Sequence, residues 1–137
     1  MIRYADINDF NILNSYDKHI NAQELKNAIH QNRIYVMHIE NKFIGWLRYN
    51  LFWDNMPFLN VLYLLEDYRG KGYGTVLIDF WERKMSEKNY GAVLTSTLSN
   101  EQAQFFYRKN GYVDCGSLLL PGEPLEIIML KQLKEES

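Results

Sequence analysis

The segment Arg69 to Thr75, which reads RGKGYGT, has the residue types and spacing that most clearly suit a chemical task. Glycines at alternating positions permit unusual backbone angles and keep side chains away from the main chain. Where such a loop leads into a helix, the first N–H groups and the positive end of the helix dipole can hold a phosphate. Arg69 and Lys71 add positive charge nearby. The spacing therefore predicts a pyrophosphate-binding loop, and a glycine turn without a ligand is the alternative.

Two other phosphate-binding motifs do not fit this loop. The dinucleotide fingerprint G-x-G-x-x-G requires glycine at position 75, where the sequence has Thr75. The pattern G-x-x-x-x-G-K-[ST] does not occur in the chain. An acidic residue that could bind a ribose at the end of a second parallel strand is also missing. A nucleotide fold of either kind is therefore not predicted.

A second segment of interest is NEQAQFFYRKNGY, which runs from Asn100 to Tyr112. We expect Asn100 at the start of a helix, where its side chain can cap the helix or contact a ligand. Tyr107 carries a phenol that can donate a proton to a leaving group. The alternative for Tyr107 is that it packs the helix against a sheet.

The elements that must position these segments follow from periodicity and turn residues. We expect a strand over 1–4 and helices that begin at the caps Asp6 and Asn21. Pro57 breaks the pattern before an almost continuously apolar strand, which we expect to be central and buried on both faces. The remaining predicted elements are a hairpin of strands over 33–40 and 43–53, the central strand 58–65, a helix over 72–88, a strand over 92–98, a helix over 100–109, and strands over 112–120 and 125–130. This alternation predicts a mixed α/β layer architecture.

Together the two segments resemble the GNAT superfamily of N-acetyltransferases. Arg69-x-x-Gly72-x-Gly74 is similar to the acetyl-coenzyme A loop of that family. The positions that resemble its second motif, N-x-x-A-x-x-x-Y-x-x-x-G-F, are Asn100, Ala103, Tyr107, Gly111 and Tyr112, with Tyr112 replacing the usual Phe. The element order matches as well, so the resemblance implies one domain over 1–137. It also implies an α+β fold with a mixed, mostly antiparallel sheet of about six or seven strands, splayed between strands 4 and 5 and flanked by about four helices.

The resemblance implies an N-acetyltransferase that uses acetyl-coenzyme A as cosubstrate and no metal. A primary amine of a small molecule or protein would attack the thioester directly in a ternary complex. The main chain of Leu64, Leu65 and Glu66 would bind the pantetheine arm, Asn100 would contact this arm, and Tyr107 would protonate the leaving thiolate. The loop that would hold the pyrophosphate consists of Arg69, Gly70, Lys71, Gly72, Tyr73, Gly74 and Thr75. A non-catalytic acyl-coenzyme A-binding or sensor module is the alternative.

The general base and the acceptor site are less well defined by the sequence. Glu66, Asp54 and His38 are candidate bases, and a water chain is another. We expect residues 52–56 to line the mouth of the acceptor site, with Asp54 attracting a cationic amine. An edge loop with a packed Trp is the alternative for this segment. We expect the single cysteine, Cys115, to be a small buried hydrophobic residue and not a nucleophile.

Composition narrows the classes of partner. The 137 residues carry a formal net charge of −2, so a broad basic face for nucleic acid is not expected. The histidines show no metal-ligand spacing, and one cysteine permits no internal disulfide framework. The first residues lack the pattern of a signal peptide, and no apolar run is long enough to cross a bilayer. We therefore predict a cytoplasmic protein with an amine acceptor, without a membrane or nucleic-acid partner, and with a loose tail over 134–137. The family resemblance leaves a homodimer open.

Overall fold

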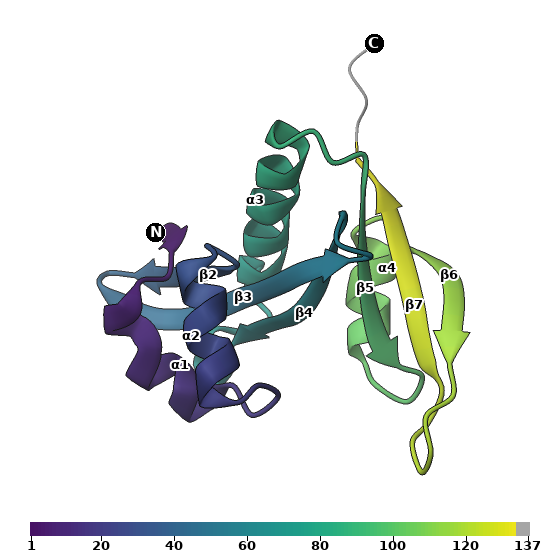
Figure 1. Cartoon of the computed structure of the whole chain (residues 1–137), viewed down its shortest axis with the longest axis horizontal. Coiled ribbons are helices and arrows are strands. Elements are labelled where there is room, and N and C mark those ends of the chain that lie inside the picture. The colour runs from purple at the N-terminus through teal and green to yellow at the C-terminus, as the bar shows by residue number, and fades with distance from the viewer. Residues whose placement is uncertain (134–137) are drawn as a thin grey trace. The chain divides into compact units, whose positions relative to one another are not determined.

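The fold is an α+β arrangement around one mixed sheet. A computed structural model describes residues 1–133. The seven strands follow the order β1-β2-β3-β4-β5-β7-β6 (Figure 1). The elements along the chain are β1 (Ile2–Tyr4), η1 (Ile7–Asp9), α1 (Phe10–Tyr16), α2 (Ala22–His30), β2 (Ile34–Ile39), β3 (Lys42–Phe52), β4 (Met56–Leu64), η2 (Glu66–Tyr68), α3 (Tyr73–Glu87), β5 (Ala92–Leu98), α4 (Ala103–Lys109), β6 (Val113–Leu118) and β7 (Glu126–Gln132). The predicted fold class is confirmed, and the predicted tail, 134–137, lies outside the described residues.

The pairing of β4 with β5 is the feature that makes the sheet mixed. These strands run parallel, with Phe58 opposite Leu94 and Leu59 opposite Thr95. The pairs β1–β2, β2–β3, β5–β7 and β6–β7 are antiparallel. Only two residue pairs make up this parallel register. Such a short pairing is what we expect of two strands that splay apart, as predicted.

Several predicted elements need correction. Pro57 does not break the pattern but is the second residue of β4, near the strand start, where a missing N–H costs little. Within β4 only Pro57 and Leu59 are buried, so the strand is central but not buried on both faces. The first helix starts with a turn of 3-10 helix, capped by Asp6, whose carboxylate accepts from the N–H of Asn8 at 2.9 Å. Helix α4 begins at Ala103 and not at Asn100.

The described chain divides into two compact units, each of which is considered by itself. The first comprises residues 1–49 and 61–77. Its core joins Leu13 of α1, Leu25 and Ile29 of α2, and Trp46 of β3. Figure 1 shows α1 and α2 on one side of β2 and β3, and the Asn21 side chain caps α2 as predicted, accepting from the N–H of Glu24 at 2.8 Å.

The second unit comprises residues 50–60 and the chain from Ile78 onward. It contains β5, β7 and β6 side by side, with α4 against β5 (Figure 1). Its buried side chains include Trp81 and Met85 of α3, Val93 of β5, and Met129 of β7. Strand β6 forms the end of the sheet order and is exposed along its length.

Candidate functional site

The glycine-rich loop lies in the first unit, directly before α3. Gly70 and Gly72 have φ angles of +73° and +88°, in the left-handed region that favours glycine. A Cβ atom at either position would meet no atom within 4 Å, so conformation and not crowding requires glycine there. Lys71 between them is exposed, and the loop presents its main chain to the outside.

The N–H groups of this loop are available to a ligand. Among the hydrogen bonds of residues 1–133, none is donated by the main-chain N–H groups of Gly70 to Thr75. The next donor, Val76, bonds to the carbonyl of Gly72 at 3.2 Å. A run of free N–H groups at the positive end of a helix is an anion-binding arrangement. The geometry of the predicted loop is therefore suited to a phosphate group.

The side chain of Arg69 turns back onto its own strand. Its Nε atom donates to the carbonyl of Leu64 at 2.9 Å, and its guanidinium lies 4.9 Å from the ring centre of Tyr63. The guanidinium thus ties the loop to the end of β4, a contact that the sequence alone did not indicate. Leu65 donates its N–H to Ile44 at 2.8 Å and accepts from Tyr68 at 2.9 Å.

The predicted pantetheine-binding segment is therefore partly engaged within the protein. The N–H of Glu66 donates none of the hydrogen bonds recorded over residues 1–133, which leaves it free for a ligand. The strand end also depends on Gly45 of β3, because a Cβ there would clash with the carbonyl oxygen of Tyr63. No sequence pattern singled out Gly45.

Tyr107 of α4 is buried in the second unit, with 7% of its surface exposed. Burial raises the pKa of its phenol to about 12, although a hydrogen bond to Thr95 acts in the opposite direction. Thr95 in turn donates its hydroxyl to the carbonyl of Leu59 at 3.1 Å, on the strand parallel to β5. Tyr107 therefore holds its proton throughout the neutral range and is connected to the β4–β5 pair. Thr95 was missed by the sequence reasoning, since an isolated strand threonine gives no signal.

Asn100 lies in the turn between β5 and α4 and is exposed. The cap position of α4 is Gln102, without a side-chain cap bond, so capping, one of the two roles open for Asn100, is wrong. Glu101 and Gln104 hold the turn instead. Glu101 accepts from the N–H of Leu98 at 3.0 Å, and Gln104 donates to the carbonyl of Ser99 at 2.8 Å. Within the described chain the Asn100 side chain makes no recorded hydrogen bond, so it stays available to a ligand.

The three candidate bases occupy different environments. Glu66 is exposed in η2. His38 lies at a bulge of β2, where burial and then the charge of Arg3 lower its pKa. Asp54 is exposed in the turn between β3 and β4, and its φ angle is +63°.

The segment 52–56 borders a cavity of about 550 Å³ in the second unit. Phe52, Trp53 and Met56 line this cavity, whereas Asp54 does not. Trp53 is 75% exposed, so the alternative of a packed Trp is wrong. Cys115 of β6 also lines the cavity and is exposed, so the expectation of a buried cysteine is wrong as well. The burial prediction failed because β6 is the outermost strand of the sheet.

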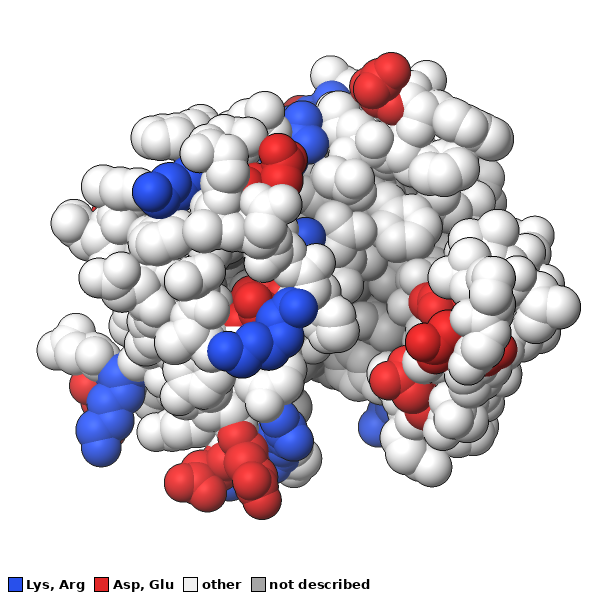
Figure 2. Space-filling view, turned by 60° about the horizontal axis from the view of Figure 1, so that its bottom comes forward, with Lys and Arg blue, Asp and Glu red and all other residues white. Residues whose placement is uncertain are grey.

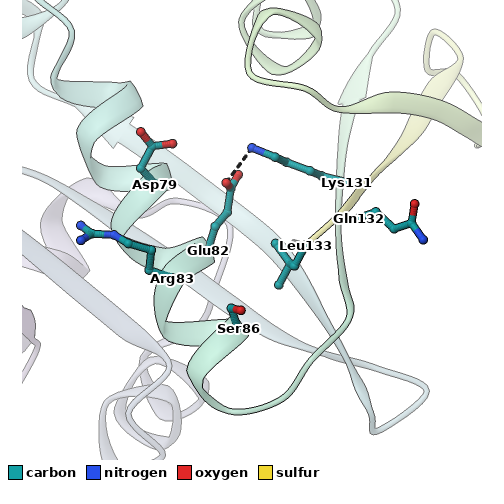
Figure 3. Close-up of a pocket in the computed structure, with 7 residues that line it drawn as sticks. All are labelled: Asp79, Glu82, Arg83, Ser86, Lys131, Gln132 and Leu133. Atoms are coloured by element: carbon teal, nitrogen blue, oxygen red, sulfur yellow. Dashed lines mark hydrogen bonds and ion pairs between the residues drawn. The ribbon is translucent and has the colours of Figure 1, made fainter. Parts of the chain in front are cut away.

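A second cavity in this unit, of about 410 Å³, lies beside a charged cluster. Figure 3 shows Lys131 reaching from β7 toward Glu82 on α3, with a distance of 2.7 Å between Nζ and Oε1. The hydroxyl of Tyr112 donates to the other carboxylate oxygen of Glu82, also at 2.7 Å. Burial and the charge of Glu82 raise the pKa of the Tyr112 phenol. This contact explains why a tyrosine can stand where the motif usually has Phe. It identifies the cluster as a structural connection among α3, β7 and the end of α4.

Within residues 1–133, charged and metal-binding side chains form no further site. Figure 2 shows acidic and basic side chains in small mixed groups on a mostly uncharged face, without a continuous basic patch. No group of His, Cys, Asp or Glu residues within 1–133 could hold a metal ion. None of the helices in the described part of the chain is long and apolar enough to span a membrane.

The model of the acetyltransferase (GNAT) family matches residues 5–112. No curated protein sequence matches the chain. Among solved structures, the chain is similar to Ard1 from Thermoplasma volcanium, with a TM-score of 0.84 and 16% identity over 98% of both chains.

Two further solved structures share the fold. The PaiA N-acetyltransferase from Thermoplasma acidophilum, in complex with coenzyme A, has a TM-score of 0.80 and 20% identity over 96% of this chain and 98% of that one. The ribosomal-protein-S18-alanine N-acetyltransferase from Escherichia coli has a TM-score of 0.80 and 12% identity over 100% of this chain and 96% of that one.

Proposed function

Because the chain belongs to the acetyltransferase (GNAT) family, we propose that it transfers an acetyl group from acetyl-coenzyme A to a primary amine of a small molecule or a protein. The observation that carries this proposal is the run of free main-chain N–H groups from Gly70 to Thr75 at the start of α3. Such a run fits a pyrophosphate, which coenzyme A contains. The similar PaiA enzyme is solved with coenzyme A, which supports the same cosubstrate here.

We assign coenzyme binding to three parts of the chain. The N–H groups of residues 70–75 bind the pyrophosphate, and Lys71 adds charge. Arg69 orients the loop, because its Nε atom donates to the carbonyl of Leu64. The N–H of Glu66, and the main chain of Leu64 and Leu65 where it is free, bind the pantetheine arm. The side chain of Asn100 contacts the same arm.

The chemistry is direct acyl transfer within a ternary complex. The lone pair of a neutral amine forms a bond to the thioester carbonyl carbon, the C–S bond breaks, and the sulfur leaves with the electron pair. Tyr107 donates its phenolic proton to that sulfur, and the nitrogen loses a proton to a base or to water. The products are an acetamide and coenzyme A, so no covalent enzyme intermediate is needed. Cys115 has no part in this sequence.

The names of two similar proteins support an amine acceptor. The name of the E. coli relative gives an alanine of a ribosomal protein as its acceptor, and PaiA is named an N-acetyltransferase. An amine acceptor is therefore our proposal for this chain, while a homodimer and a cytoplasmic location stay predictions. The identity of the base is left among Glu66, Asp54, His38 and water.

The experiment is to titrate the purified protein with acetyl-coenzyme A by calorimetry and then to measure thiol release over a library of amines. We expect saturable binding and release of coenzyme A with a subset of amines. Binding without release for any amine would favour a non-catalytic acyl-coenzyme A-binding module. Absence of any binding heat would contradict the proposed function.

A further inference from the structure

The cavity beside the β3–β4 turn has a size that suits a small molecule. It is formed by one face of the second unit's strands together with the turn at Trp53. On β5, for example, Leu94 and Ser96 line it, whereas Thr95 between them does not, because neighbouring strand residues point to opposite faces. Its volume of about 550 Å³ falls within the range of small-molecule sites, which is about 300–1,000 Å³.

The lining of this cavity is apolar and carries no formal charge. Phe58, Leu94 and Leu130 contribute apolar surface from three strands. The polar groups among the described lining residues include the amide of Asn60, the hydroxyl of Ser96 and the thiol of Cys115. None of these lining residues is Lys, Arg, His, Asp or Glu. A diamine would bring a second positive charge into this uncharged lining. That charge would lose its hydration without gaining a charged partner. The cavity therefore favours an apolar body over a polycation.

The polar end of the cavity lies where the β4–β5 pairing ends. The last parallel pair is Leu59 with Thr95, and the next residue on each strand, Asn60 and Ser96, lines the cavity. Thr95 faces the other side of β5, where it interacts with the buried Tyr107. A thioester carbonyl bound at the end of this pairing would therefore have the cavity on one side of β5 and the phenol of Tyr107 on the other side. This is the arrangement that an attacking amine and a proton donor to the leaving group need.

We propose that the acceptor is a monoamine whose apolar, ring-sized body occupies this cavity, with its amino group directed toward Asn60 and Ser96. This inference deepens the proposed function and rests on it. Trp53, which is exposed at the cavity, covers the apolar body of the bound amine. Asp54 stands next to Trp53 outside the lining, where it attracts the ammonium form before it enters.

The first test measures binding without any acetyl transfer. Of the three Trp residues, Trp46 and Trp81 are buried and Trp53 is exposed, so a change in exposed-indole emission reports on the cavity. Cys115 is the single cysteine and lines the same cavity, so its alkylation rate is an independent reporter. With 2-phenylethylamine we expect a blue shift of emission, lost in Trp53→Phe, and slower alkylation of Cys115. With 1,4-diaminobutane, the matched dication, we expect neither effect.

The second test measures turnover with a matched pair of variants. Leu118 and Leu119 are neighbours with exposed fractions of 52% and 78%, but only Leu118 is among the residues that line the cavity. Leu118→Gln should lower kcat/KM for 2-phenylethylamine about tenfold, because an apolar contact worth one or two methylenes changes specificity by that order. Leu119→Gln should leave it unchanged. In the parent protein, kcat/KM for 2-phenylethylamine should exceed that for 1,4-diaminobutane at least about tenfold.

The outcomes separate the inference from the proposed function. The inference would be overturned if 1,4-diaminobutane released thiol as fast as 2-phenylethylamine or faster and neither amine slowed the alkylation of Cys115. The acetyltransferase function would stay intact in that case. Equal kinetics of the Leu118 and Leu119 variants would also overturn it. Failure of every amine to release coenzyme A would overturn the proposed function, and the acceptor inference would fall with it.

Discussion

At the scale of single residues, Tyr107 has the environment of a group that must keep its proton. Its pKa is raised to about 12 from an ordinary value of 10.0, chiefly by burial. Tyr107→Phe should leave acetyl-coenzyme A affinity unchanged and lower kcat by about a hundredfold, the lower range for a lost general acid. Stopped-flow thiol release and calorimetry would separate the two quantities. An unchanged kcat would assign Tyr107 to packing alone.

The same residue makes a prediction about pH. Because the folded-state pKa is above the unfolded value, the stability linked to the protonated phenol is complete below about pH 10 and is lost as pH rises toward about 12. Urea unfolding followed from about pH 9 to about pH 12 should show the free energy of unfolding falling less steeply in Tyr107→Phe than in the parent. Parallel pH curves for both proteins would contradict the assigned cause.

Tyr112 differs from Tyr107 because its hydroxyl has a charged partner inside the protein. Tyr112→Phe removes the 2.7 Å hydrogen bond to Glu82 and leaves that carboxylate with Lys131. We expect a loss of about 1.5–3 kcal/mol in the free energy of unfolding, the range for a hydrogen bond to a charged group. Chemical denaturation measures it, and Tyr16→Phe, at an exposed helix position, is the control. Equal stability of the two variants would show that the Glu82 contact contributes little.

At the scale of elements, the loop before α3 sets how the helix start meets a ligand. Gly72→Ala places a Cβ on a residue with a φ angle of +88°, whereas Gly91→Ala adds the same atom at a position without a left-handed angle and with equally open space. The left-handed conformation costs an L-residue about 1–2 kcal/mol. We therefore expect Gly72→Ala to weaken acetyl-coenzyme A binding about tenfold and Gly91→Ala to have no effect. Isothermal titration of both variants checks this, and equal affinities would show that the loop does not hold the coenzyme.

Element by element, the sequence predicted most of what is local and little of what depends on distant neighbours. The hairpin of β2 and β3, the cap at Asn21 and the start of α3 follow from patterns within a few residues, and the structure agrees. The exposed Cys115 and the partly exposed β4 were mispredicted because burial depends on which strand lies at the edge and what covers each face.

For the candidate site too, the sequence predicted the local features and not the contacts between distant residues. Its loop could be found from glycine spacing, and Tyr107, which we propose as the proton donor, could be found from a motif. The contacts that hold them could not. Arg69 with Leu64 and Thr95 with Leu59 join separate positions through side-chain-to-carbonyl bonds that leave no periodic trace in the sequence.

At the scale of the whole molecule, the two compact units share continuous elements. The boundaries after Tyr49, Asn60 and Leu77 fall inside β3, β4 and α3. Because melting one unit would interrupt hydrogen bonding in elements of the other, we expect a single cooperative transition by calorimetry. The single domain over 1–137 stays a prediction, and this measurement tests it. Two resolved transitions would contradict it.

Ligand binding should raise that transition. Acetyl-coenzyme A at a hundred times its dissociation constant should stabilise the native chain by about 2.7 kcal/mol. Differential scanning calorimetry with and without the cosubstrate measures the shift, and coenzyme A lacking the acetyl group should produce a similar one if the pyrophosphate loop supplies most of the affinity. Adenosine, which has no phosphate, is the negative control.

The turn between β3 and β4 carries a consequence for how the protein can be altered. Trp53 and Asp54 both have positive φ angles, +55° and +63°, in a turn closed by a bond from Asn55 to Phe52. Such a turn prefers Asn-Gly, and a bulky indole there is under backbone strain. Trp53→Asn should therefore raise the free energy of unfolding by about 1 kcal/mol. The same change removes the indole that lines the cavity. Because we propose that Trp53 covers the bound amine, we expect a screen for heat resistance alone to select variants with a lower kcat/KM.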